Sequence, residues 1–264
     1  MILSHGGPGG RARTRIGRRA VLAAPFAALV PCARAAEDVD LPDALTTATV
    51  RTDAPGRSDR GPALRRALGL VLAKLSGNPG LESDARVDAM DPAPLVLDLS
   101  YQDVLIDKPV HDEQGTRDRP YLLTVRFDPG GLRGALAALG ERPWVSGRGR
   151  IGPMLTLRFR DGRETMLTGD DPLLDRPRAA LTDAGVRYAM AIALPLMGAV
   201  TVPRGADRVD GSVTWVEAEF GWRATFRLRG DEWGVSGASL DEAFRAFVGG
   251  AALRLRPGGV AGAR

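Results

Sequence analysis

The first 36 residues differ so strongly from the rest of the chain that they decide which part of it folds. A basic, glycine-rich start leads to the pair Arg18-Arg19, and an alanine-rich apolar stretch then runs to Ala33. The segment ends on Ala33-x-Ala35, the small-x-small pattern of a cleavage site. This order is typical of a twin-arginine export signal. We predict a cleaved signal over residues 1–36, with cleavage after Ala35, and a periplasmic location for the remainder.

The apolar stretch, residues 20–33, is interrupted by Pro25 and Pro31. It is well short of the roughly 20 apolar residues that cross a bilayer, so we expect no stable membrane span. Two other interpretations stay open. The segment could be a basic tail, or Cys32 could carry a lipid, although Pro31 stands where a small residue is usual.

Removing the signal reverses the sign of the net charge. The whole chain has 36 basic and 32 acidic residues, and residues 1–36 hold six arginines and no acidic residue. The remainder therefore has 30 basic against 32 acidic residues, a net charge of −2. The high pI thus gives no reason to expect nucleic-acid binding, and we predict none. The only cysteine leaves with the signal, so the mature chain has no disulfide and no thiol nucleophile.

From Thr46 onward, short strands alternate with helices, which predicts an α+β fold with an N-terminal α/β part. The clearest unit is the strand Tyr121–Phe127, in which apolar and polar residues alternate before a helix capped by Asp128, with Pro129 at its first position. Other strands are expected at residues 46–52, 95–101, 155–159, 164–167 and 189–194, and helices at 62–75 and 177–188.

The second predicted part is a smaller C-terminal antiparallel meander with one helix. We place residues 37–200 in the α/β domain and residues 201–264 in this part, because residues 197–210 combine a proline, glycines and charges. The expected strands are 212–220, 222–229 and 232–236. A capping box of Ser239 and Glu242 opens the helix, which Gly249-Gly250 is expected to close before a last strand at residues 253–255.

Three patterns that could carry chemistry stand in the wrong context. Residues 147–152 match G-x-G-x-x-G, but Pro153 and a strand follow where a dinucleotide site needs a helix. His111 is the only histidine after cleavage, and no G-x-S-x-G elbow accompanies it. The acidic run Asp170, Asp171 and Asp175 resembles helix caps more than a cation site. We assign no catalytic, cofactor or metal-binding residues.

The four tryptophans leave two interpretations open. Trp215, Trp222 and Trp233 are close together in the C-terminal part, where they could pack in the core or form an aromatic binding face. Arg148 and Arg150 follow Trp144. Trp144, Arg148 and Arg150 are therefore candidates for a surface contact with an anion or a peptide.

A helix ending in Leu-Ser-Gly-Asn at residues 75–78, a strand ending in Phe127-Asp128, and Pro143-Trp144 occur in this order. In this order the chain resembles the bacterial family called domain of unknown function 2066, over about residues 50–197. Gly147-Arg148-Gly149-Arg150 departs from that family, which has an arginine-proline pair there. The resemblance implies an exported protein and assigns no catalytic residue, because that family is itself uncharacterised.

These observations predict a non-catalytic binding or envelope-assembly module that acts in the periplasm, with an envelope protein as its partner. Two alternatives remain. A periplasmic hydrolase would need a cleft with two carboxyl groups of shifted pKa, and a small-ligand carrier would need an enclosed apolar cavity. The sequence makes no prediction of the oligomeric state.

Overall fold

The computed structural model describes residues 41–52, 57–106 and 120–259. These residues form one compact unit that contains helices and two sheets, so the α+β prediction is confirmed. The predicted export signal and His111 lie outside the described residues. Of the helices in the described ranges, none combines the length and the apolar character that crossing a membrane requires.

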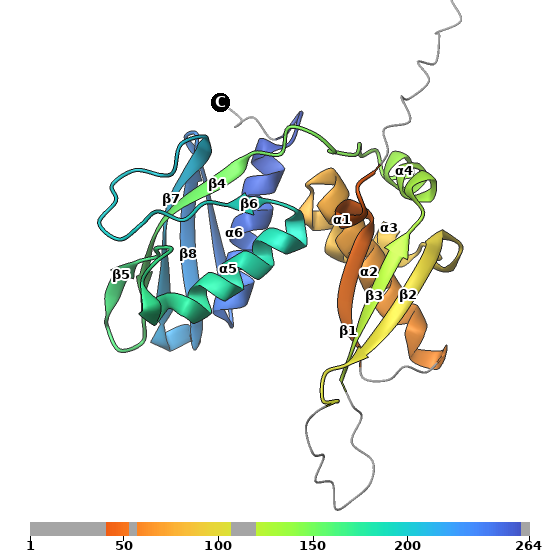
Figure 1. Cartoon of the computed structure of the whole chain (residues 1–264), viewed down its shortest axis with the longest axis horizontal. Helices are drawn as coiled ribbons and strands as arrows, with labels where there is room; N and C mark the ends of the chain where they lie inside the picture. The colour runs from red at the N-terminus through yellow and green to blue at the C-terminus, as the bar shows by residue number, and fades with distance from the viewer. Residues whose placement is uncertain (1–40, 53–56, 107–119, 260–264) are drawn as a thin grey trace, which may run out of the picture. The chain divides into compact units, whose positions relative to one another are not determined.

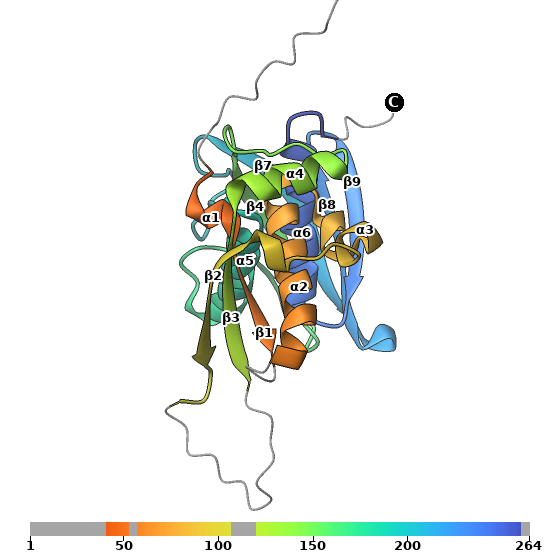
Figure 2. The same cartoon turned by 90° about the vertical axis from the view of Figure 1, so that its right-hand side faces the viewer.

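The first sheet has three antiparallel strands in the order β1-β3-β2. The strands are β1 (Thr47–Thr52), β2 (Val96–Asp103) and β3 (Tyr121–Phe127), and the helices α2 (Arg57–Ser76) and α4 (Pro129–Ala138) lie beside them (Figures 1 and 2). Shorter elements are α1 (Asp43–Thr46), α3 (Ala85–Asp88) and the 3₁₀ helices η1 (Pro79–Ser83) and η2 (Ala93–Leu95).

The centre of this sheet follows from its sequence pattern. Leu123, Val125 and Phe127 of β3 are fully buried, as their alternation predicts. Asp128 then ends the strand and begins α4, because its Oδ2 accepts a hydrogen bond of 2.6 Å from the backbone N–H of Gly131. The predicted bounds of this strand and the predicted cap are confirmed.

The second sheet has six strands in the order β5-β4-β7-β8-β9, with β6 also paired to β4. Strand β4 is parallel to β6 and β7, and the other pairs are antiparallel. Helices α5 and α6 lie together on one face (Figure 1). The elements are β4 (Arg150–Arg158), β5 (Glu164–Met166), η3 (Pro172–Leu174), α5 (Asp175–Tyr188), β6 (Ala191–Ile192), β7 (Ala206–Val216), η4 (Glu217–Glu219), β8 (Gly221–Leu228), β9 (Asp231–Gly237) and α6 (Leu240–Leu255).

Each sheet has its own hydrophobic core. One cluster of buried residues runs from Leu41 to Leu139, and the other runs from Trp144 to Ala252. The expected domain boundary after residue 200 falls between β4 and β7, which are neighbours in one sheet. The two cores instead meet in sequence at residues 140–143.

Helix α6 corrects two predictions. It runs through Gly249 and Gly250 to Leu255, so residues 253–255 are helical and form no strand. A Cβ atom on Gly250 would lie 2.4 Å from Nε1 of Trp233, and one on Gly249 would lie 3.0 Å from Cβ of Pro79. The two glycines therefore allow neighbouring groups to pack against the helix and do not end it.

Helix α2 also differs from its prediction. It begins at Arg57, so Pro62 lies inside the helix and not at its first position. Proline lacks the N–H that would bond to the carbonyl of residue 58, so one helical hydrogen bond is missing near this end. The predicted C-terminal end is confirmed, because Ser76 is the last helical residue and Gly77 adopts a φ of +72°.

We predict that Gly250→Ala lowers the free energy of unfolding by about 1–3 kcal/mol, because the added methyl group overlaps the Trp233 ring. The matched control is Gly134→Ala in the exposed part of α4, where a Cβ atom would meet nothing within 4 Å. That substitution should raise the free energy of unfolding by roughly 0.5–1 kcal/mol. Urea denaturation of both variants measures the two effects. Equal effects would show that Gly250 is not a packing position.

Candidate functional site

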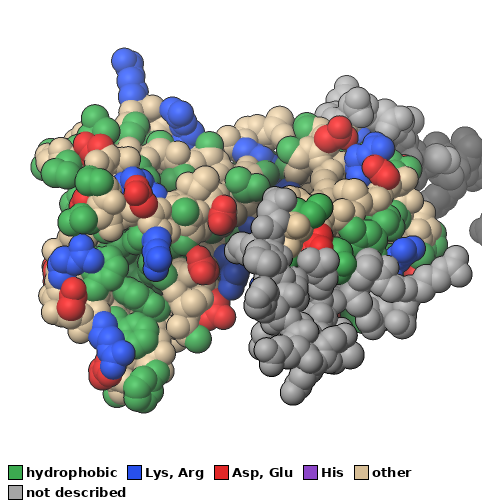
Figure 3. Space-filling view, turned by 60° about the horizontal axis from the view of Figure 1, so that its bottom comes forward, with side chains coloured by type: hydrophobic (Ala, Val, Ile, Leu, Met, Phe, Trp, Pro, Cys, Tyr) green, Lys and Arg blue, Asp and Glu red, His purple; other side chains and the backbone are tan. Residues whose placement is uncertain are grey.

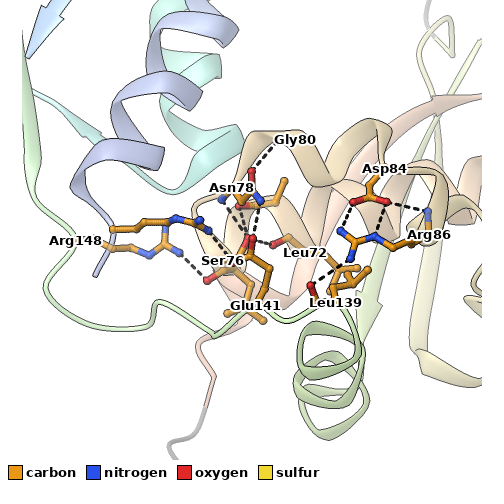
Figure 4. Close-up of polar contacts among 12 residues, drawn as sticks. Leu72, Ser76, Asn78, Gly80, Asp84, Arg86, Leu139, Glu141 and Arg148 are labelled. Atoms are coloured by element: carbon orange, nitrogen blue, oxygen red, sulfur yellow. Dashed lines mark hydrogen bonds and ion pairs between the residues drawn. The ribbon is translucent and has the colours of Figure 1, made fainter. Parts of the chain in front are cut away.

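Arg148 holds the C-terminal end of α2. Its guanidinium donates to the backbone carbonyls of Lys74 at 2.5 Å, Trp144 at 2.9 Å and Tyr188 at 2.8 Å. Figure 4 shows Arg148 reaching toward the end of α2 near Ser76. The charge of Arg148 complements the negative end of the helix dipole, and its Cζ lies 4.6 Å from the centre of the Trp144 ring. Burial lowers the pKa of Arg148 to about 10, so the group stays protonated at neutral pH.

Two further contacts complete this junction, which consists of the end of α2, residues 139–148 and the end of α6. Trp144 donates its backbone N–H to the carbonyl of Leu75 at 2.7 Å. Glu141 accepts hydrogen bonds from Nδ2 of Asn78 at 2.6 Å (Figure 4) and from Nη1 of Arg256 at 2.7 Å. Segments that belong to the two cores are thereby joined by polar contacts.

The three residues expected at a surface contact lie in different environments. Trp144 is buried, and Arg148 points inward to the carbonyls that it binds. Arg150 is exposed at the start of β4. The structure therefore brings Trp144 and Arg148 together as parts of the junction and leaves Arg150 apart from them.

Of the other tryptophans, Trp222 and Trp233 pack against the second core, as the core interpretation expects. Trp233 packs with Phe247, with ring planes 8° apart, at the core. Trp215 and Trp222 are half-buried and meet edge to face, with ring centres 5.7 Å apart. Figure 3 shows one face of the whole molecule, on which exposed hydrophobic side chains are interspersed with basic and acidic ones.

The acidic run serves local structure. Asp171 caps η3 by accepting from the N–H of Leu173 at 2.9 Å, Asp170 accepts from the N–H of Met197 at 2.8 Å, and Asp175 pairs with Arg178. Across the described ranges, no group of three or more His, Cys, Asp or Glu side chains is placed to hold a metal ion. Residues 147–152 lead into β4 and not into a helix.

A concave site lies between α2 and α5, and we call it the α2–α5 groove. The α2 side of the groove consists of Arg66, Leu70 and Lys74, which recur every four residues along the helix and lie beside β1. Helix α5 contributes Val186 and Arg187. The larger part of the groove has a volume of about 820 Å³, and an adjoining hollow has about 370 Å³. The groove is also lined by Ala44, Thr47, Thr49, Val50, Arg51, Glu82, Leu122, Asp183 and Ala189.

Lys74 is the buried charge of this groove. It is 8 % exposed, and its Nζ donates to the carbonyls of Ala44 at 3.1 Å and Thr47 at 2.8 Å. No described carboxylate forms an ion pair with it. Burial, and then the charges of Arg148 and Arg187, lower the pKa of Lys74 to about 8. The group is thus largely protonated at neutral pH.

Arg187 fixes α5 against η1. Its Nε donates to Glu82 Oε1 at 3.0 Å, and its Nη2 pairs with Glu82 Oε2. Burial alone would lower the pKa of Arg187, but the Glu82 carboxylate outweighs it and raises that pKa. Burial and the charge of Glu82 raise the pKa of the neighbouring Tyr188.

No sequence pattern pointed to this groove. A lysine near the end of a helix normally extends into solvent, and only the fold brings Ala44 and Thr47 to it. One signal was present, because the chain has only two lysines among 36 basic residues. Lysine has a compact ammonium group where arginine has a planar guanidinium, so Lys74 stands out in an arginine-rich chain.

Comparison with known proteins corrects the family resemblance. Residues 42–145 match a different family model, Domain of unknown function (DUF8605), and this match covers less than half of the chain. The resemblance to domain of unknown function 2066 was therefore wrong. Leu-Ser-Gly-Asn and Phe-Asp are the end of α2 and the cap of α4, local signals that unrelated chains share. The matched segment contains every buried residue of the first core except Leu41. No curated protein and no solved structure matched the chain.

We predict that Arg148→Lys lowers the free energy of unfolding by about 2 kcal/mol, because an ammonium cannot reach the carbonyls that the guanidinium fork binds. The matched control is Arg150→Lys, an exposed position that should change this value by less than about 0.5 kcal/mol. Thermal and urea unfolding of the two variants test the difference. If both substitutions have the same small effect, Arg148 does not hold the junction.

Proposed function

We propose that the chain is exported to the periplasm by the twin-arginine route and acts there as a non-catalytic binding or envelope-assembly module. Its binding site would be the α2–α5 groove. The observation that carries this proposal is Lys74, a buried cation that is held by carbonyl groups and paired with no described carboxylate. Neutral carbonyls do not cancel a charge, so the groove keeps a positive potential that a bound anionic group would neutralise.

The export part of the proposal rests on the sequence. Arg18-Arg19, the apolar stretch after them and Ala33-x-Ala35 support a cleaved signal. An envelope location would give a binding module access to membrane lipids and to envelope proteins.

Binding is better supported than hydrolysis by carboxylates. An acid catalyst needs a raised pKa, whereas the two carboxyl groups with clear shifts are lowered: Asp84 by hydrogen bonds from Arg86, and Glu217 by hydrogen bonds from Trp215 and Arg160. The groove is partly open to solvent and is not a closed cavity. A partly open site suits binding of a ligand at the surface better than carriage of a ligand inside a closed cavity.

The test introduces a photo-crosslinking residue into the full chain in its own host. Val186→p-benzoylphenylalanine places the probe in the groove, and Leu173→p-benzoylphenylalanine is the matched control. Both side chains are highly exposed, at 69 % and 73 %, so neither substitution should disturb the fold. The periplasmic and cytoplasmic fractions are both irradiated and analysed by mass spectrometry of the intact protein.

We expect a chain that begins at Ala36 and an adduct at position 186 that is absent at position 173. Adducts at neither position, or equal adducts at both, would overturn the groove as the binding site. A chain that retains residues 1–35 and stays in the cytoplasm would overturn export alone.

A further inference from the structure

We propose that the ligand of the α2–α5 groove is a single-chain fatty carboxylate, with its carboxylate near Lys74 and Arg187 and its acyl chain against Leu70, Leu122 and Val186. This inference rests on the proposed function, because it names the ligand class of the same groove. Three features support it: the charge of the groove, its apolar walls and the state of the β1 edge.

The groove has spare positive charge and one spare donor. Two of the three N–H groups of Lys74 are used on the carbonyls of Ala44 and Thr47, which leaves one. Arg187 contributes its charge, while its guanidinium already binds Glu82 and the side chain of Tyr188. The lining contains four basic side chains against two acidic ones: Arg51, Arg66, Lys74 and Arg187 against Glu82 and Asp183. This excess of positive charge complements an anionic group.

The remaining walls are aliphatic. Leu70 of α2, Leu122 of β3 and Val186 of α5 line the same volume, together with Ala44 and Ala189. Val186 is 69 % exposed although it belongs to a packed helix. A volume of about 820 Å³ lies within the range of small-molecule sites, roughly 300–1,000 Å³. An acyl chain in this space would cover the exposed valine.

The edge of β1 argues against an extended peptide as the ligand. A peptide that adds to a sheet donates its N–H groups to the carbonyls of the edge strand. At β1, the carbonyl of Thr47 already accepts from Lys74, and that of Arg51 accepts from Arg66 at 2.9 Å. Cationic side chains at a sheet edge are a common protection against strand addition. An acyl chain needs no such acceptors.

The test measures binding of dodecanoate to the chain purified from the periplasm, by isothermal titration calorimetry below the concentration at which micelles form. Dodecanol has the same chain without the charge, and acetate has the charge without the chain. We expect one dodecanoate per chain, with binding at least about tenfold weaker for each of the other two probes. Affinity should rise roughly two- to fourfold for each methylene added between octanoate and dodecanoate.

Val186→Glu adds a like charge and removes apolar wall, so it should weaken dodecanoate binding about tenfold or more. Leu173→Glu introduces the same side chain at an equally exposed position outside the groove and should leave binding unchanged. Equal binding of dodecanol and dodecanoate, equal effects of the two variants, or no binding would overturn this proposal.

The two proposals can fail separately. If the crosslink at position 186 forms in cells but dodecanoate does not bind, the groove is a binding site for another ligand class, and the mass of the adduct distinguishes a protein from a phospholipid. If neither is observed, the binding function itself is contradicted.

Discussion

Backbone carbonyl groups, and not carboxylates, hold the two cations on which this structure depends, the half-buried Arg148 and the buried Lys74. Arg148 binds carbonyls of α2, of the segment that links the two cores and of the end of α5. Lys74 binds carbonyls of α1 and of the start of β1. Buried charges usually need partners of opposite sign, because desolvation is costly. Several carbonyl dipoles can replace such a partner, but the net positive charge remains.

This way of holding cations explains why the groove lies where it does. Lys74 joins β1 to α2, and the Arg187–Glu82 pair joins α5 to η1, so the two walls are fixed by separate polar contacts. Gly69 helps, because a Cβ atom there would lie 3.3 Å from the carbonyl oxygens of Leu81 and Glu82. Because Gly69 has no Cβ atom, η1 can approach α2 closely, and this places Glu82 beside Arg187. Structural stability and ligand recognition would thus share the same residues.

The sequence predicted the elements whose signals are local. The alternation in β3, the Asp128 cap and the capping box of Ser239 and Glu242 each specify a structure within a few residues, and all are observed. Features that depend on distant contacts were missed. Gly249-Gly250 has the local pattern of a helix end, and only the position of Trp233 explains why the helix continues. The groove could not be predicted from the sequence either, because Lys74 and Arg187 are far apart along the chain.

The central claim is that Lys74 is a buried cation poised to meet an anion, and the most direct test is its pKa. Because the chain has only two lysines, ¹⁵Nζ labelling yields two side-chain signals, which Lys74→Arg assigns. A pH titration by NMR should give a pKa of about 8 for Lys74 in the free protein, and a higher value with dodecanoate, because a bound carboxylate stabilises the charged form. An ordinary lysine pKa of about 10.4 that dodecanoate leaves unchanged would contradict the account.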